Sequence, residues 1–177
     1  MPRLLSPALA LALALGASPA SAAEIFAGLL AHDVDTPLTS GGFEDGADIE
    51  LGWRGDRSDA LRFLGRPQPY VFASLATGGE THFAAAGLSW RLGGGRFFAR
   101  PGIGLAIHTR SSHGVMNGFR TDLGSRILFE PELGLGYRIS ERVSLEAAWV
   151  HVSHAQLFSR QNPGMDSIGL RFSFRLP

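Results

Sequence analysis

The segment Val143-Ser144-Leu145-Glu146-Ala147-Ala148-Trp149-Val150-His151-Val152-Ser153 determines how the rest of this chain is interpreted. Leu145 and Trp149 occupy odd positions, whereas Ser144 and Glu146 occupy even ones. Successive side chains of a β-strand point to opposite faces. The alternation therefore predicts a strand with one apolar face and one polar face.

The same alternation recurs along the chain in short segments separated by turn residues, which is typical of a membrane β-barrel. Eight segments are present if two less regular ones, 24–34 and 68–77, are included. The other six are 46–53, 82–92, 97–107, 127–139, 143–153 and 166–176. Small barrels of this strand number have interiors filled by side chains. The sequence thus predicts an all-β fold, an eight-stranded antiparallel transmembrane β-barrel of the outer membrane.

Charges of both signs share the polar faces, which predicts a salt-bridged interior rather than a wide pore. The inward set is Asp48, Glu50, Arg54, Arg91, Arg100, Glu130, Glu132, Arg138, Glu146 and Arg171. A lipocalin-like barrel with the faces reversed is the alternative on pattern alone. A soluble core could not hold these mid-strand charges unpaired. Aromatic residues near the strand ends, such as Trp53 and Tyr137, also resemble an interfacial girdle.

Composition narrows the class of protein further. The 177 residues carry zero formal net charge and no cysteine, and all 16 basic residues are arginine. A balanced charge argues against a nucleic-acid partner, which requires a basic excess. The absence of cysteine excludes disulfides and cysteine-based metal sites.

Residues 1–22 are interpreted as a secretory signal peptide, followed by the barrel domain over residues 23–177. Arg3 gives a short basic start, an apolar core follows, and Ala20-Ser21-Ala22 gives the small-residue cleavage pattern. A transmembrane anchor is the alternative, but the apolar stretch is shorter than the ~20 residues that a spanning helix needs.

The connections divide into two sets if the first strand starts in the periplasm. Periplasmic connections are then 56–67, with room for a short helix, and the turns 93–95 and 140–142. The outer loops are 35–45, 77–80, 109–125 and 155–165.

Three polar residues occupy the apolar register of the last two predicted strands, at their outer ends. Parity places His151 and Ser153 on the apolar face of one strand and Asp166 on that of the next. Polar groups on a lipid-facing surface are costly, so this placement requires a reason. A serine, a histidine that takes its proton and a carboxylate that orients the histidine form the arrangement of nucleophilic catalysis. At a membrane surface they indicate an acyl ester substrate. The simpler interpretation is a headgroup-zone strand end followed by a turn residue.

The segments His151-Val152-Ser153-His154-Ala155 and Asn162-Pro163-Gly164-Met165-Asp166-Ser167-Ile168-Gly169-Leu170-Arg171 resemble the C-terminal signature of the PagL-type lipid A 3-O-deacylases. In that family of outer-membrane barrels the signature is His-x-Ser-Asn, then a loop asparagine, then an acidic residue on the last strand. The specific motifs occupy residues 151–166 of this chain.

The resemblance implies that Ser153 is the nucleophile, His151 the general base and Asp166 the acidic partner. The implied reaction is hydrolysis of the ester-linked 3-hydroxyacyl chain at the 3-position of lipid A. Asn162 matches the loop asparagine, which implies an oxyanion role together with backbone N–H groups near Ser153. Two departures bear on activity. His154 replaces the family's asparagine, which puts an oxyanion or positioning role there in doubt. Asp166 is one methylene shorter than the usual glutamate, so it reaches His151 only if the strands sit close together.

Several charged residues lie in or beside the predicted outer loops. Arginine suits bidentate phosphate contact, and solvated loop charges are the more common case. The candidate lipid-phosphate ligands are Arg110, Arg120, Arg126 and Arg160. His32, Asp33 and Asp35 are close in sequence but are interpreted as loop residues rather than as a metal site.

We therefore expect a serine-dependent lipid A deacylase that acts on lipopolysaccharide in the outer leaflet and needs neither a cofactor nor a metal. Two alternatives are a non-enzymatic small barrel, structural or surface-binding, and a phospholipase-like esterase. The assembly state is open between a monomer and a homodimer.

Overall fold

The computed structural model describes residues 23–39, 44–78, 81–109, 123–157 and 162–177. This part of the chain forms eight strands and one 3-10 helix, η1 (Asp59–Leu64). The strands are β1 (Glu24–Ala31), β2 (Ala47–Arg54), β3 (Gln68–Ala76), β4 (Phe83–Ser89), β5 (Phe97–His108), β6 (Ile127–Arg138), β7 (Val143–Val152) and β8 (Met165–Arg175). The signal peptide expected at residues 1–22 lies outside the described residues. None of the helices in the described ranges is long and apolar enough to cross a membrane.

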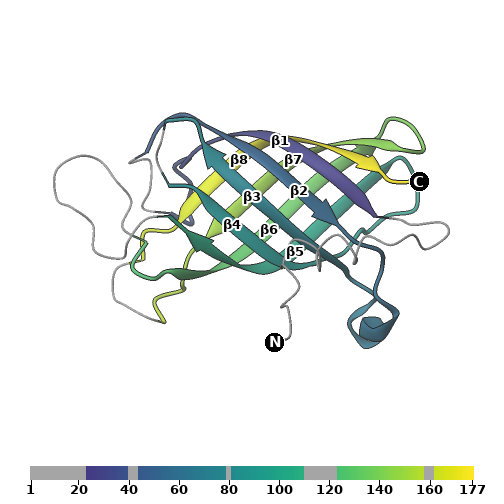
Figure 1. Cartoon of the computed structure of the whole chain (residues 1–177), viewed down its shortest axis with the longest axis horizontal. Helices are drawn as coiled ribbons and strands as arrows, with labels where there is room; N and C mark the ends of the chain where they lie inside the picture. The colour runs from purple at the N-terminus through teal and green to yellow at the C-terminus, as the bar shows by residue number, and fades with distance from the viewer. Residues whose placement is uncertain (1–22, 40–43, 79–80, 110–122, 158–161) are drawn as a thin grey trace, which may run out of the picture.

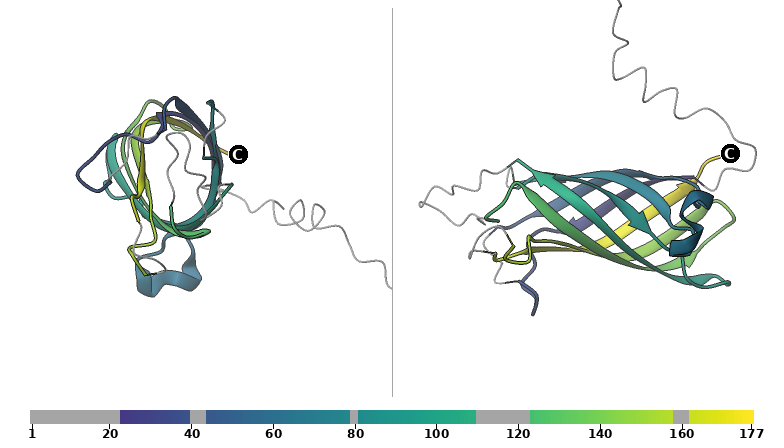
Figure 2. Two further views of the ribbon diagram at one scale, coloured as in Figure 1. Left: turned by 90° about the vertical axis from the view of Figure 1, so that its left-hand side faces the viewer. Right: turned by 90° about the horizontal axis from the view of Figure 1, so that it is seen from below.

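The strands form one closed antiparallel barrel. Each strand pairs with its neighbour in sequence, and β1 also pairs with β8. Figure 1 shows the tilted strands from the side, and the left view of Figure 2 shows the ring that they form. Because each of these strands has two partners, their backbone groups are paired around the whole ring. The predicted fold is confirmed.

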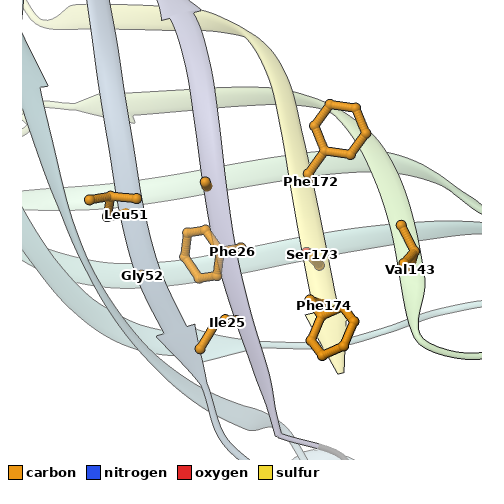
Figure 3. A pocket seen from close by; sticks show the side chains of 9 residues that line it. Ile25, Phe26, Leu51, Gly52, Val143, Phe172, Ser173 and Phe174 are labelled. Atoms are coloured by element: carbon orange, nitrogen blue, oxygen red, sulfur yellow. The ribbon is translucent and has the colours of Figure 1, made fainter. Parts of the chain in front are cut away.

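The outer face of the barrel is apolar. Leu51 and Phe172 point outward and remain 57% and 54% exposed. Figure 3 shows these two residues, with Ile25 and Phe174, around an apolar hollow of about 440 Å³ on the outside of the wall. A fold with the faces reversed would bury these side chains, so the lipocalin-like alternative is wrong.

The interior holds paired charges. Eight of the predicted inward residues are buried: Asp48, Glu50, Arg54, Arg100, Glu130, Glu132, Glu146 and Arg171. The other two, Arg91 and Arg138, lie outside or at the end of a strand and are only partly buried. Arg171 contacts Glu50 at 2.7 Å and Glu132 at 2.8 Å. Buried charges require such partners, and the predicted salt-bridged interior is therefore present.

The two ends of the barrel differ. The turn end carries the short connection 139–142, η1 and the C-terminus (Figure 1). The loop end carries residues 32–39 and 44–46, which are the described part of the first loop, and residues 153–157 and 162–164. The helix expected between residues 56 and 67 is η1. The candidate catalytic residues lie at the loop end, where β7 finishes and β8 begins.

Candidate active site

The pairing of β7 with β8 brings two of the candidate residues face to face. His151 lies directly opposite Asp166 in the register of the two strands. Directly opposed residues of an antiparallel pair point to the same side of the sheet, which is the outer side here. Ser153 follows two residues after His151, also outward, and is held against β6 by a bridge to Phe129.

The three side chains form a hydrogen-bonded chain. His151 Nδ1 lies 2.7 Å from Asp166 Oδ1, and His151 Nε2 lies 2.9 Å from Ser153 Oγ. An ionised carboxylate only accepts hydrogen bonds, so the proton of a neutral imidazole belongs on Nδ1. Nε2 is then the acceptor for the Ser153 hydroxyl. This is the arrangement in which an imidazole can take a proton from serine.

The site is recessed although it faces outward. Asp166 is 0% exposed, His151 is 8% exposed and Ser153 is 9% exposed. The shorter acidic side chain reaches His151 because the two residues are opposed directly rather than diagonally across the strands. The register therefore supplies the short separation that an aspartate requires at this position.

Two neighbours fix the orientation of the His151 ring. The Trp149 indole stacks beside it, with ring centroids 6.0 Å apart and an interplanar angle of 25°. On another side, a methyl group added at Gly164 would lie 2.9 Å from His151 Cε1. Gly164 also has a φ of +69°, a conformation that glycine adopts without steric cost. The Asn-Pro-Gly stretch thus ends in the residue type that leaves room for the imidazole.

Asn162 and His154 meet through the main chain rather than through two side chains. The His154 N–H donates to Asn162 Oδ1 at 2.9 Å, and the His154 residue is fully buried. The Ser153 N–H donates to the Phe129 carbonyl at 3.1 Å. Both backbone N–H groups nearest the serine are therefore already engaged, contrary to the expectation that they hold an oxyanion. The group that Asn162 can still offer to a substrate is its amide nitrogen, Nδ2.

The expected phosphate ligands are not assembled in the described part of the chain. Arg110, Arg120 and Arg160 lie outside the described residues. Arg126 is exposed just before β6.

A second histidine cluster, which sequence reasoning missed, lies inside the loop end. His32 Nδ1 is 2.9 Å from Asp48 Oδ1, and His32 Nε2 is 3.0 Å from Glu44 Oε2. All three side chains are fully buried. Burial alone would lower the pKa of His32, but the hydrogen bonds and charges of Asp48 and Glu44 raise this pKa to about 9. We refer to these three residues as the His32 cluster.

The sequence indicated that His32 is an ordinary loop residue. In the structure, its buried contacts with Glu44 and Asp48 anchor the first loop. Its partners come from residues 44 and 48, not from Asp33 or Asp35, the acidic neighbours in sequence. In the described residues, no group of three ligating side chains is suited to a metal ion. Two further bonds tie the first loop and the cluster to β8: Thr36 Oγ1 donates to Asp166 Oδ2, and Ser167 Oγ donates to Asp48 Oδ2 at 2.6 Å.

Comparisons with known proteins agree with this architecture. A family model described as lipid A 3-O-deacylase (PagL) matches residues 39–175. The crystal structure of the outer membrane enzyme PagL aligns with a TM-score of 0.59 at 23% identity, covering 86% of this chain and 99% of that one. The Yersinia pestis outer membrane protein Ail, solved in a phospholipid bilayer nanodisc, aligns with a TM-score of 0.50 at 10% identity, covering 87% and 98%. A search of curated protein sequences finds no match.

Proposed function

Because the chain belongs to the lipid A 3-O-deacylase (PagL) family, we propose that it is an outer-membrane serine esterase acting on lipid A. The reaction that we propose is hydrolysis of the ester-linked 3-hydroxyacyl chain at the 3-position. We further propose that residues 1–22 direct export and are removed as a signal peptide.

One observation carries the assignment of the site. The Ser153 hydroxyl, the His151 imidazole and the Asp166 carboxylate are hydrogen-bonded in that order, with separations of 2.9 and 2.7 Å. A chain in this order allows serine to act as the nucleophile, histidine as the base and the carboxylate as the group that fixes the tautomer. A headgroup-zone strand end would not require this order.

The chemistry proceeds in two stages. Ser153 Oγ attacks the ester carbonyl carbon while its proton passes to His151 Nε2, and Asp166 stabilises the imidazolium that forms. The proton then passes from Nε2 to the departing sugar oxygen, the carbon–oxygen ester bond breaks, and the acyl chain remains on Ser153. A water molecule, deprotonated by Nε2, then attacks the acyl carbonyl carbon. The bond from this carbon to Ser153 Oγ breaks, the proton passes from Nε2 to Ser153 Oγ, and the 3-hydroxy fatty acid is released.

Negative charge develops on the carbonyl oxygen during each attack and requires a hydrogen-bond donor. Asn162 is the candidate, because the main chain of His154 holds its Oδ1 at 2.9 Å and so fixes the orientation of the amide. Its Nδ2 group is the donor that would contact the oxyanion. His154 itself contributes through its backbone and so acts by positioning Asn162.

The outer surface of the barrel suits a lipid substrate. Below the site, Ile168 and Leu170 point outward from β8 and are exposed. Exposed apolar side chains in this position face acyl chains when a barrel lies in a membrane. A lipid A molecule in the outer leaflet would place its ester bonds near the loop end and its acyl chains along this surface.

The test is mass spectrometry of lipid A from cells that express the wild-type protein, Ser153→Ala or Ser144→Ala. Ser144 lies on β7, the strand that ends just before Ser153, but points inward near the turn end, so it is the matched control. We expect one 3-hydroxyacyl chain to be lost with the wild type and with Ser144→Ala but retained with Ser153→Ala. Identical spectra for all three would favour a non-enzymatic barrel. Release of fatty acid from phospholipid alone would identify a phospholipase-like esterase.

A further inference from the structure

We propose that Thr36, in the first loop, is a positioning residue that holds the Asp166 carboxylate in place for its interaction with His151. The inference rests on the proposed function, because it concerns the same hydrogen-bonded chain. It adds to that chain a fourth residue, which comes from the opposite end of the sequence.

The direction of the Thr36 hydrogen bond is determined by its second partner. The Leu38 N–H donates to Thr36 Oγ1 at 3.1 Å. The hydroxyl oxygen thus accepts one hydrogen bond, and its own hydrogen is available to Asp166 Oδ2, which lies within hydrogen-bonding distance. A carboxylate oxygen can only accept, so Thr36 must be the donor.

With this contact, each oxygen of the Asp166 carboxylate accepts a hydrogen bond from a different donor. Oδ1 accepts from His151 and Oδ2 accepts from Thr36. Asp166 is 0% exposed, so bulk water does not reach it to replace a lost partner. Without the Thr36 hydroxyl, Oδ2 would lose this donor, and the carboxylate could rotate about its own Cβ–Cγ bond. Rotation would lengthen the bond to His151 and loosen the imidazole that receives the serine proton.

Hydrogen bonds within the first loop and to β8 hold the Thr36 hydroxyl in position. Thr36 and Thr39 close a turn, in which the Thr39 N–H donates to the Thr36 carbonyl at 3.1 Å and the Thr36 N–H donates to Thr39 Oγ1 at 3.2 Å. The Val34 N–H donates to the Asp166 carbonyl at 2.8 Å, which ties the loop backbone to the start of β8. The His32 cluster fixes the loop where it leaves β1. The hydroxyl is therefore held from both sides.

The contact also lies outside the pattern by which the family is identified. The family model matches residues 39–175 and so begins after Thr36. The catalytic motifs of the resemblance lie within residues 151–166. Thr36 is thus assigned by its contact in this structure and not by the family signature.

Three variants separate the Thr36 hydroxyl from a general effect of changing a threonine at the loop end. Thr36→Val keeps the shape of the side chain but removes the donor, and Thr36→Ser keeps the donor. The control, Thr109→Val, makes the same exchange at a threonine whose hydroxyl bonds the main chain of His82. On purified, refolded protein with lipid A as substrate, we expect Thr36→Val to lower kcat roughly 10- to 100-fold with KM changed less than about threefold. Thr36→Ser should restore most of kcat, and Thr109→Val should keep it within about threefold of the wild type.

A spectroscopic measurement tests the contact without substrate. The His151 Nδ1 proton, hydrogen-bonded to a carboxylate, should give a low-field proton resonance in detergent-solubilised, ¹⁵N-labelled protein. We expect Thr36→Val to shift or broaden this resonance and both Thr36→Ser and Thr109→Val to leave it in place. The resonance is assigned by its loss in His151→Gln.

The outcomes distinguish the two proposals. Wild-type kcat and an unmoved resonance in Thr36→Val would overturn the role of Thr36, as would an equal loss of kcat in Thr109→Val. If the wild type does not hydrolyse lipid A, the proposed function fails, while the resonance still decides whether Thr36 holds Asp166.

Discussion

Two histidines at the loop end each contact an aspartate through Nδ1, but they differ in the partner of Nε2. His151 Nδ1 lies 2.7 Å from Asp166, and His32 Nδ1 lies 2.9 Å from Asp48. The second nitrogen makes the difference, because His151 Nε2 meets a serine hydroxyl whereas His32 Nε2 meets the carboxylate of Glu44. A histidine between a carboxylate and a hydroxyl can remain neutral and accept a proton. A histidine between two carboxylates is held in its charged form and becomes an anchor.

The His32 cluster and the Ser153–His151–Asp166 group lie on opposite sides of the barrel wall. Two consecutive residues of β8 contact them. Asp166 points outward to His151, and the next residue, Ser167, points inward to Asp48 at 2.6 Å. The alternation of the strand therefore places the proposed catalytic histidine on the outer side of the wall and the anchoring histidine on the interior side.

The largest effect is expected from the two aspartates. Asp166→Asn should lower kcat on lipid A about 10⁴-fold, because an amide in place of the carboxylate allows the wrong imidazole tautomer. Asp48→Asn removes the same type of partner from His32 and should leave kcat within about tenfold of the wild type, while destabilising the barrel by roughly 3 kcal/mol as a buried charge pair is broken. Kinetics and denaturant titration in phospholipid vesicles measure both. Equal kinetic losses would contradict the division between reactive and structural clusters.

A smaller effect is expected from the protonation of His32. Its pKa is about 9 in the folded barrel, against an ordinary value of 6.5. The folded state thus binds this proton more tightly than the unfolded chain does. The resulting stabilisation, roughly 3 kcal/mol, is complete below about pH 6.5, declines as the pH rises and is lost above about pH 9.

The measurement is the free energy of unfolding at pH 6 and at pH 9.5, for the wild type and for His32→Gln. We expect the wild type to lose more stability than the variant over this interval, which removes the contribution of other titrating groups. Parallel pH dependences for the two proteins would mean that His32 is not held as a cation in the fold.

The common outward face of His151, Ser153 and Asp166 was predictable from the sequence because these residues follow the period of the strands. Once Trp149 is placed outward, parity places His151 and Ser153 outward as well, and the same rule places Asp166 on the neighbouring strand. The buried charges followed for the same reason. What parity could not supply was the exact register of β7 against β8, on which the reach of an aspartate depends.

The loop contacts were not predictable, because loops have no period. Thr36 meets Asp166 across 130 residues of sequence, and neither residue carries a local signal for the other. Closeness in sequence instead drew attention to Asp33 as a neighbour of His32, whereas the partner carboxylates belong to Glu44 and Asp48. Asp48, an interior carboxylate at the start of β2, was a hint, since a buried charge requires a partner.

The smallest effects are expected from alanine substitutions at two glycines, one near His151 and one near the His32 cluster. Gly164 beside His151 and Gly46 beside the His32 cluster have φ values of +69° and +116°. A methyl group at Gly164 would lie 2.9 Å from His151 Cε1, whereas one at Gly46 would lie 3.4 Å from Thr77 Oγ1. Both alanine variants should lose stability, by about 1 kcal/mol at Gly164 and more at Gly46, where φ is less accessible to alanine.

Only one of these glycine variants should lose activity. In Gly164→Ala the imidazole must move by a few tenths of an ångström, and we expect kcat to fall about tenfold because the Ser153–His151 bond is sensitive to such a displacement. In Gly46→Ala the strain falls on the backbone before β2, where the Gly46 carbonyl accepts a hydrogen bond from the His32 N–H, and kcat should remain near that of the wild type. Gly164→Ala should therefore have the larger effect on kcat, and Gly46→Ala the larger effect on the free energy of unfolding. If Gly46→Ala instead lowers kcat as much as Gly164→Ala, the anchor and the reactive site are coupled through the first loop, and the route of that coupling would be the bond from Thr36 to Asp166.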